Sequence, residues 1–393
     1  MTGPAFPTGP LAPGPVAYPQ PVPADLLRHR ISPLTWVSMI VLGLGGLFMA
    51  VLVLAIGGAA GSVITTLLAA LSFPLLILIC FWLDRYEPEP GRYRLAALGW
   101  GAVVAVALSF IAEQLFFAIA GTDEFVDTAI LAPLIEESAK GLFLVAIMIL
   151  RRSEIHGLLD GIVYAALVGI GFAFVEDIVY YLGSLSQGGA AGLSTTFILR
   201  GVMSPFAHPL FTSATGIGIG IAVSTRKPAL RVVAPVSGFV VAVGLHGLWN
   251  GSTFWGTGAY FRTYGTIMLP LLVIVLAVAI WARTQEGKML TRSLEQVVPM
   301  GWIQPDEIRW VARLSDRMSS RGYAKIHGGP SAKRALGAYQ QTMTEVGFLH
   351  AWAVAGTAPR DLNQRMSVLL AHAAALRPYV ILPPPPGPGP GVR

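Results

Sequence analysis

Residues 126–150 read VDTAILAPLIEESAKGLFLVAIMIL. A helix of about 20 mainly apolar residues can cross the roughly 30 Å hydrocarbon layer of a bilayer. This stretch is long enough, yet it carries Glu136, Glu137 and Lys140 near its middle. Lys140 follows the two carboxylates by four and three residues, so a helix brings it beside both of them. We therefore predict a transmembrane helix that holds charged side chains inside the membrane.

The rest of the chain has the same apolar character. It has 393 residues, 54% of them hydrophobic and 12% charged, with a mean hydropathy of +0.64. Soluble domains carry about 25% charged residues. The single cysteine, Cys80, excludes a disulfide framework and a cysteine-based zinc site. The net charge of +6 lies mostly between apolar segments and near the C-terminus, so we expect the lipid bilayer as a partner and no nucleic acid.

Apolar stretches of membrane-spanning length recur along the chain. About eight are present, near residues 35–57, 62–83, 96–119, 126–150, 157–182, 201–224, 231–252 and 264–283. Basic residues occur in alternate connections, with Arg200 and Arg262 as exceptions. Because cytoplasmic loops are enriched in Lys and Arg, both termini are predicted in the cytoplasm. The fold class expected is an all-α, polytopic membrane helix bundle in the cell membrane.

The two ends of the chain differ from this bundle. Residues 1–32 are rich in Pro and lack the order of charge, short apolar core and cleavage site that marks a secretory signal, so we predict a disordered cytoplasmic arm. Residues 33–284 form the predicted membrane-embedded domain. Residues 285–381 show helical spacing of apolar residues between charges, which indicates a small helical cytoplasmic appendage. Residues 382–393 are a Pro/Gly-rich tail.

Further polar residues lie inside later apolar stretches. They are Glu176, His208, His246 and Asn250. A charge at the centre of a membrane helix costs about 2.5–3.5 kcal/mol on insertion scales, so such residues usually face the protein interior and mark function. A structural ion pair, or a histidine bonded to a backbone carbonyl, is the simpler alternative for any one of them. His246 and Asn250 lie four residues apart and share one helix face.

The depth of these residues favours a common site. At about 1.5 Å per residue, Glu136 lies about 15 Å below the outer end of its span, His208 about 11 Å, and Glu176 and His246 about 9 Å each. These four residues come from four different stretches and fall in one layer. We predict a single Glu/Glu/Glu/His/His site in the outer half of the bilayer.

Carboxylates and imidazoles in one cluster can support metal-assisted hydrolysis. A catalytic zinc keeps three protein ligands and one open position, and Glu176, His208 and His246 form such a set. In that case Glu136 or Glu137 would take the proton of the attacking water, Lys140 would pair with these carboxylates, and Asn250 would stabilise the oxyanion. A metal-free reaction, with Glu136 activating the water directly, stays open.

Four motifs resemble those of the PrsW family of intramembrane metalloproteases. They are Glu136-Glu137-Ser-Ala-Lys140, Phe172-x-x-x-Glu176, the isolated His208, and His246-x-x-x-Asn250. The stretch Asp84-Arg85-Tyr86-Glu87-Pro88-Glu89-Pro90 is also similar to that family, and the likeness covers roughly residues 75–255. It implies kinship with CAAX-processing membrane proteases. It also implies a membrane-protein substrate, for example an anti-sigma factor, and a divalent metal such as zinc.

Two other functions fit the same residues. A non-catalytic scaffold or binding protein could keep the polar layer for packing. A proton-coupled transporter could use intramembrane carboxylates and histidines as a relay, although no correspondence between two halves of the sequence supports it.

Overall fold

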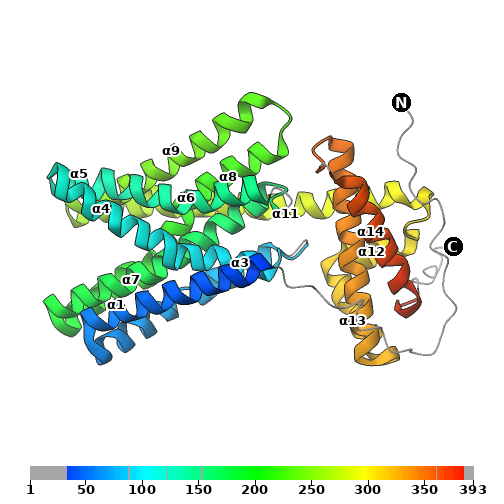
Figure 1. Ribbon diagram of the computed structural model, residues 1–393, viewed down its shortest axis with the longest axis horizontal. Coiled ribbons are helices and arrows are strands. Elements are labelled where there is room, and N and C mark those ends of the chain that lie inside the picture. The colour runs from blue at the N-terminus through cyan, green and yellow to red at the C-terminus, as the bar shows by residue number, and fades with distance from the viewer. Residues whose placement is uncertain (1–32, 87–88, 122, 152–153, 360, 385–393) are drawn as a thin grey trace, which may run out of the picture. The chain divides into compact units, whose positions relative to one another are not determined.

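The structure, a computed structural model, describes residues 33–86, 89–121, 123–151, 154–359 and 361–384 (Figure 1). Within these ranges every regular element is a helix. The predicted arm at residues 1–32 and most of the predicted tail lie outside the described residues. The described residues divide into two compact units, one within 33–84 and 89–282 and the other of 85–86 and those within 283–384.

The first unit holds the long apolar helices. In chain order these are α1 (Pro33–Ser72), α2 (Pro74–Leu83), α3 (Gly91–Gly99), η2 (Trp100–Ala105), α4 (Val106–Ala120), α5 (Glu124–Val126), η3 (Asp127–Leu131), α6 (Ala132–Leu150), α7 (Leu158–Thr196), η5 (Phe197–Met203), α8 (Ala207–Ser224), α9 (Pro228–Ser252), η6 (Thr253–Trp255), α10 (Thr257–Thr263), η7 (Tyr264–Met268) and α11 (Leu269–Val297), which continues into the second unit. Two of them bend at a glycine in the left-handed region, α1 at Gly58 and α7 at Gly189.

Five of the described stretches are long and apolar enough to cross a membrane. They are Val53–Leu83, Gly91–Ile119, Leu158–Ser224, Pro228–Trp255 and Thr257–Met300. The third contains both α7 and α8, and α6 carries the three charged residues that lower its apolar character. The chain is therefore a multi-pass membrane protein built of helices. The number of about eight crossings stays a prediction.

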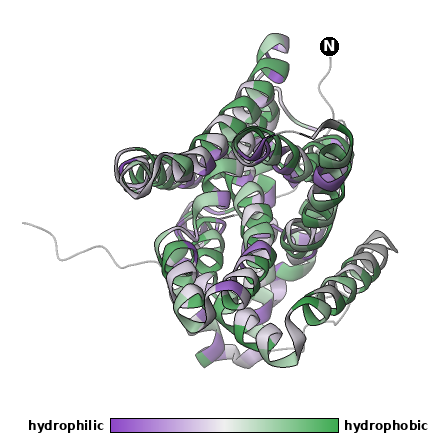
Figure 2. Cartoon of the chain, turned by 90° about the vertical axis from the view of Figure 1, so that its left-hand side faces the viewer, coloured by the Kyte–Doolittle hydropathy of each residue, from purple (hydrophilic) through white to green (hydrophobic). Residues whose placement is uncertain are grey.

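The outer surface of the first unit is apolar, as a lipid-facing surface should be. Large hydrophobic side chains such as Leu44, Leu71 and Val232 are exposed by 65%, 70% and 65%. In water such a surface would drive aggregation, whereas in a bilayer it meets hydrocarbon. Figure 2 shows the apolar colouring along most of these helices, with polar positions interspersed.

Helix α7 lies at the centre of the first unit because small residues let its neighbours approach its backbone. A Cβ added at Gly161 would lie 2.2 Å from the carbonyl oxygen of Gly216 in α8, and one at Gly171 would lie 2.0 Å from that of Leu98 in α3. Close backbone approach at small residues is a common way for membrane helices to associate. This packing fixes α7 and α8 against each other, and both carry residues of the candidate site.

The second unit is a smaller helical body. Its elements are η8 (Val298–Met300), η9 (Pro305–Glu307), α12 (Ile308–Ala312), α13 (Leu314–Ala355), α14 (Leu362–Leu376) and η10 (Arg377–Tyr379). Leu336, Met343 and Leu376 are fully buried in it. Pro305 opens η9 and is followed by two acidic residues, which is a favourable helix start because negative charge lies at the positive end of the helix dipole. The cytoplasmic location of this unit stays a prediction.

Candidate functional site

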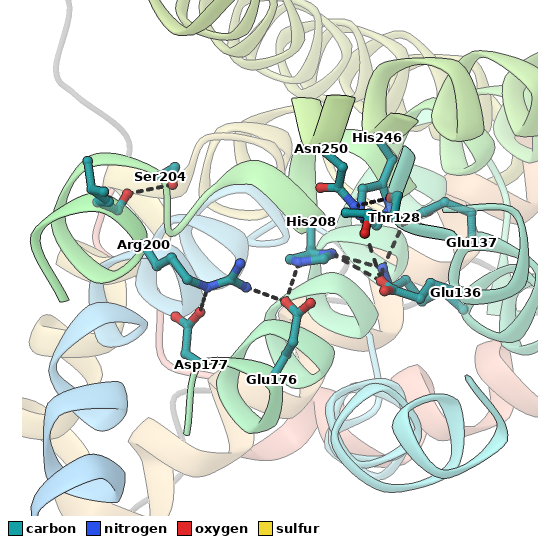
Figure 3. Close-up of polar contacts among 12 residues, drawn as sticks. Thr128, Glu136, Glu137, Glu176, Asp177, Arg200, Ser204, His208, His246 and Asn250 are labelled. Atoms are coloured by element: carbon teal, nitrogen blue, oxygen red, sulfur yellow. Dashed lines mark hydrogen bonds and ion pairs between the residues drawn. The ribbon is translucent and has the colours of Figure 1, made fainter. Parts of the chain in front are cut away.

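Helices α6, α7, α8 and α9 bring the predicted site residues to one place (Figure 3). Glu136 and Glu137 come from α6, Glu176 from α7, His208 from α8 and His246 from α9. Glu137, Lys140 and His246 are buried with exposures of 1%, 0% and 1%. Charged side chains are almost never this deeply buried without partners, so their contacts define the site.

Lys140 is fully satisfied at the centre of the cluster. Its Nζ lies 3.1 Å from Oε2 of Glu136, 2.8 Å from Oε1 of Glu137 and 2.9 Å from Nδ1 of His208. An ammonium has three N–H donors, and here each has an acceptor. The Phe172 ring lies 3.8 Å from the same nitrogen and adds a cation–π contact. Lys140 thereby compensates much of the carboxylate charge.

Each histidine has one ring nitrogen on a carboxylate. His208 Nε2 lies 2.6 Å from Oε2 of Glu176, and His246 Nδ1 lies 3.1 Å from Oε1 of Glu137. A carboxylate can only accept, so in the neutral rings these nitrogens carry the proton. The other nitrogens, Nδ1 of His208 and Nε2 of His246, therefore present lone pairs. Both face Oε2 of Glu136, at 3.9 Å and 3.8 Å.

The cationic partner of Glu176 is Arg200, which the sequence alone did not identify. Arg200, in the π-helical segment η5, donates to Oε2 of Glu176 and, at 2.6 Å, to Oδ1 of Asp177. Its guanidinium also lies 4.0 Å from the ring centre of Tyr180. In the sequence, Arg200 stands out only as an exception to the charge pattern of the loops. That exception was the available signal, because a basic residue that departs from the charge pattern is a candidate partner for an acid inside the membrane.

Asn250 lies on the same face of α9 as His246, as its spacing predicted. Its Nδ2 donates to the carbonyl oxygen of Thr128 at 3.0 Å. Thr128 lies in η3, where the wider π-helical turn precedes α6. Asn250 thus ties α9 to the start of the helix that carries Glu136.

A groove of about 430 Å³ leads to the cluster. Ser109, Phe110 and Glu113 of helix α4 line it together with Glu136, Glu176 and Asn250. The Ser109 hydroxyl is buried and has no hydrogen-bond partner within the described part of the chain. The groove therefore offers polar groups, within apolar walls, to a molecule that enters it.

The residues fit a divalent metal. Ligand atoms of Glu136, His208 and His246 all lie within 4.8 Å of one another. Two imidazoles and a carboxylate are a common ligand set for zinc. Metal-bound histidines usually donate their second N–H to a carboxylate or carbonyl, and Glu176 and Glu137 accept these protons here. The ammonium of Lys140 contacts two of the same atoms and so competes for them.

These observations define the chain as a polytopic helical membrane protein with a buried carboxylate–imidazole centre. Sequence comparison then narrows the class. The model of the PrsW family intramembrane metalloproteases matches residues 89–280, and no solved structure matches significantly.

Several curated relatives cover the same region. Protease PrsW of Geobacillus kaustophilus is 29% identical over 170 residues, which are 42% of this chain and 69% of that protein. Protease PrsW of Bacillus subtilis is 29% identical over 177 residues, 45% of this chain and 77% of that protein. Protease PrsW of Clostridioides difficile is 32% identical over 149 residues, 36% of this chain and 60% of that protein.

Over residues 89–280 the chain matches the PrsW family of intramembrane metalloproteases. The resemblance inferred from four short motifs is confirmed, and so is the enzyme class, a membrane-embedded peptide hydrolase. A divalent metal is part of the family's description. The roles of the individual site residues stay predictions.

Proposed function

We propose that this chain hydrolyses a peptide bond of a membrane-anchored protein at the Glu136/His208/His246 cluster. One observation carries the assignment. Two imidazole lone pairs face the carboxylate Oε2 of Glu136, at 3.8 Å and 3.9 Å, inside a buried site. Such groups repel each other unless a cation lies among them, and Lys140 contacts only one of the two imidazoles.

These distances favour Glu136 as a metal ligand in the place that the sequence-based prediction gave to Glu176. The sequence pattern predicts Glu176, His208 and His246 as ligands and Glu136 or Glu137 as the base. The geometry favours Glu136 as the third ligand, with Glu137 and Glu176 orienting the imidazoles. Zinc is the proposed metal because nitrogen and oxygen ligands in this number suit it. When bound, it would lower the pKa of a water molecule and polarise the substrate carbonyl.

The chain's own residues then have separate tasks. Glu176 faces the groove and is held in place by Arg200, so it is the proposed acceptor for the proton of the attacking water. Lys140 donates to both neighbouring carboxylates and offsets part of their negative charge. Asn250 lines the groove and is the proposed donor to the developing oxyanion. In the metal-free alternative, Glu136 takes the proton itself.

The substrate is proposed to enter along the groove beside α4. A transmembrane helix has already satisfied its backbone hydrogen bonds, so cleavage needs a locally unwound segment. The unpartnered Ser109 hydroxyl and the Glu113 carboxyl in the groove wall could bond the groups that unwinding frees. The PrsW resemblance suggests an anti-sigma factor as one such substrate. We further propose that the site lies in the outer half of the bilayer and that both termini lie in the cytoplasm.

A comparison of membrane proteins in two strains tests this function. One strain carries the native chain and the other the Glu136→Ala variant. We expect a membrane-anchored protein to accumulate uncut in the variant strain and to be processed in the native one. Glu124→Ala, which removes an exposed carboxylate outside the site, is the matched control and should behave as native. Full processing by a Glu136→Ala/Glu137→Ala double variant would contradict the proposal.

A further inference from the structure

Helix α13 of the second unit is a hairpin rather than a straight rod. Gly329 breaks it with φ 71° and ψ −169°, and Pro330 follows. A left-handed φ is easily adopted only by glycine, so this residue lets the chain reverse. The two arms lie against each other, because a Cβ added at Gly337 in the second arm would lie 3.6 Å from Nε of Arg321 in the first.

An open basic pocket lies along the hairpin. It has a volume of about 610 Å³ and is lined by Arg321, Lys325, Pro330, Lys333, Arg334 and Gly337. Four of these residues are cationic and none is acidic. The sequence explains this excess, since no Asp or Glu occurs between Arg317 and Thr344. Like charges gathered in one concave site repel one another.

Three other basic residues of the same unit, Arg309, Arg365 and Arg377, are paired with acids, whereas among the described residues the four pocket residues are not. Arg309 pairs with Asp316 at 3.2 Å, and Arg377 pairs with Glu307. Within the described part of the chain no salt bridge involves any of the four pocket cations. The contrast points to an anion supplied from outside the chain.

The guanidinium of Arg321 is fixed in position by a hydrogen bond to Gln340. Its Nε donates to Oε1 of Gln340 at 2.6 Å. Gln340 is fully buried and is itself fixed, because its Nε2 donates to the carbonyl oxygen of Trp310 and to Oγ of Ser320, at 2.8 Å and 2.9 Å. Partial burial lowers the pKa of Arg321. An anion beside the guanidinium would stabilise its positive charge and so offset the effect of burial.

We propose that this pocket binds a phosphate group, carried either by an anionic lipid headgroup or by a small soluble molecule. Guanidinium groups bind phosphate oxygens through paired N–H bonds, and lysines add point charges. Pockets of about 300–1,000 Å³ suit small molecules or headgroups. The four cations line one pocket instead of following a long stripe, which favours a compact phosphate over a nucleic acid.

The test uses the full-length protein in neutral detergent. Binding is measured by calorimetric titration with two probes, inorganic phosphate and a short-chain phosphatidic acid, with the matching phosphatidylcholine as a blank. The variant Lys333→Gln/Arg334→Gln removes two exposed pocket cations. The control Arg292→Gln/Arg365→Gln removes the same charge from outside the pocket.

We expect the native protein and the control to bind at least one of the two phosphate probes. The pocket variant should bind at least about tenfold more weakly, because it lacks two of the four cations that line the pocket. Binding of phosphatidic acid alone would identify a lipid headgroup as the source, and binding of both probes a free phosphate group. Absence of binding by the native protein, equal weakening in the control, or tighter binding of a DNA oligonucleotide than of either probe would overturn the proposal.

Discussion

At the scale of single residues, the site depends on which nitrogen of each imidazole carries its proton. Glu176 accepts from Nε2 of His208, and Glu137 accepts from Nδ1 of His246. These two contacts turn the remaining lone pairs toward Glu136. Carboxylates that act through a histidine in this way determine both ring orientation and ligand basicity. Glu137 and Glu176 are therefore as important to the proposed centre as its ligands.

The variant Glu137→Gln tests this role. Its amide could donate to Nδ1 of His246 and so favour the tautomer with the proton on Nε2, which would remove a ligand lone pair. We expect metal affinity to fall about 10–100-fold, measured by competition with a chromophoric chelator. Glu124→Gln, an exposed change, should leave the affinity unchanged. An unaltered affinity in a folded Glu137→Gln protein would show that Glu137 does not orient the ligand.

Sequence reasoning identified the members of the cluster but not all of their partners. The charges inside apolar stretches were visible because lipid rejects them, and their depths predicted one layer. The Arg200–Glu176 ion pair was not predicted, because the chain bends at Gly189 and passes through η5 between the two residues. Helical spacing predicts which residues are neighbours on one helix, whereas this contact depends on how η5 packs against α7.

At the scale of helices, the site depends on the contact between α7 and α8. Gly161 and Gly216 face each other there, and a Cβ on Gly216 would lie 2.2 Å from the carbonyl oxygen of Gly161. His208 follows η5 at the start of α8, and Glu176 lies along α7. Moving the two helices apart would therefore lengthen the contact between these residues.

Gly216→Ala should destabilise the protein by about 1–3 kcal/mol, the usual cost of overpacking. The expected readout is a lower unfolding temperature in detergent. Gly183→Ala makes the same chemical change in α7, where the added Cβ meets nothing within 4 Å, so it should leave that temperature unchanged or raise it slightly. Equal unfolding temperatures for the two variants would argue against close α7–α8 packing.

The helices themselves were largely predictable, and their irregularities were not. Each predicted apolar stretch coincides with described helical segments. The π-helical segments η2, η3, η5 and η7 could not be predicted, because the pattern of apolar residues does not distinguish them from α-helix. Yet η3 supplies the carbonyl of Thr128 that accepts from Asn250, and η5 carries Arg200. Such segments often lie at functional sites, and here two of them contact the cluster.

At the scale of the whole molecule, the distribution of basic residues predicts which loops face the cytoplasm. The connection between α8 and α9 contains Arg226 and Lys227, whereas the residues around the bend of α7 at Gly189 carry no charge. By the positive-inside rule the first should be cytoplasmic and the second external. The proposed site then lies nearer to the external surface.

Cysteine labelling of intact cells tests this orientation. Cys80 is buried and is the only cysteine, so Cys80→Ala gives a cysteine-free background. We expect a membrane-impermeant thiol reagent to label Gln187→Cys in intact cells and Lys227→Cys only after the membrane is opened. Both positions are exposed, which makes them a matched pair. The reverse labelling pattern would invert the proposed topology.

The central claim is a divalent metal held by Glu136, His208 and His246 inside an intramembrane protease. Its most direct test is elemental analysis of the purified full-length protein beside His246→Ala and the exterior control Glu124→Ala. We predict about one equivalent of zinc per chain in the native protein and the control, and loss of that metal in His246→Ala. Cleavage of the native substrate by protein that contains no stoichiometric divalent metal would contradict the account.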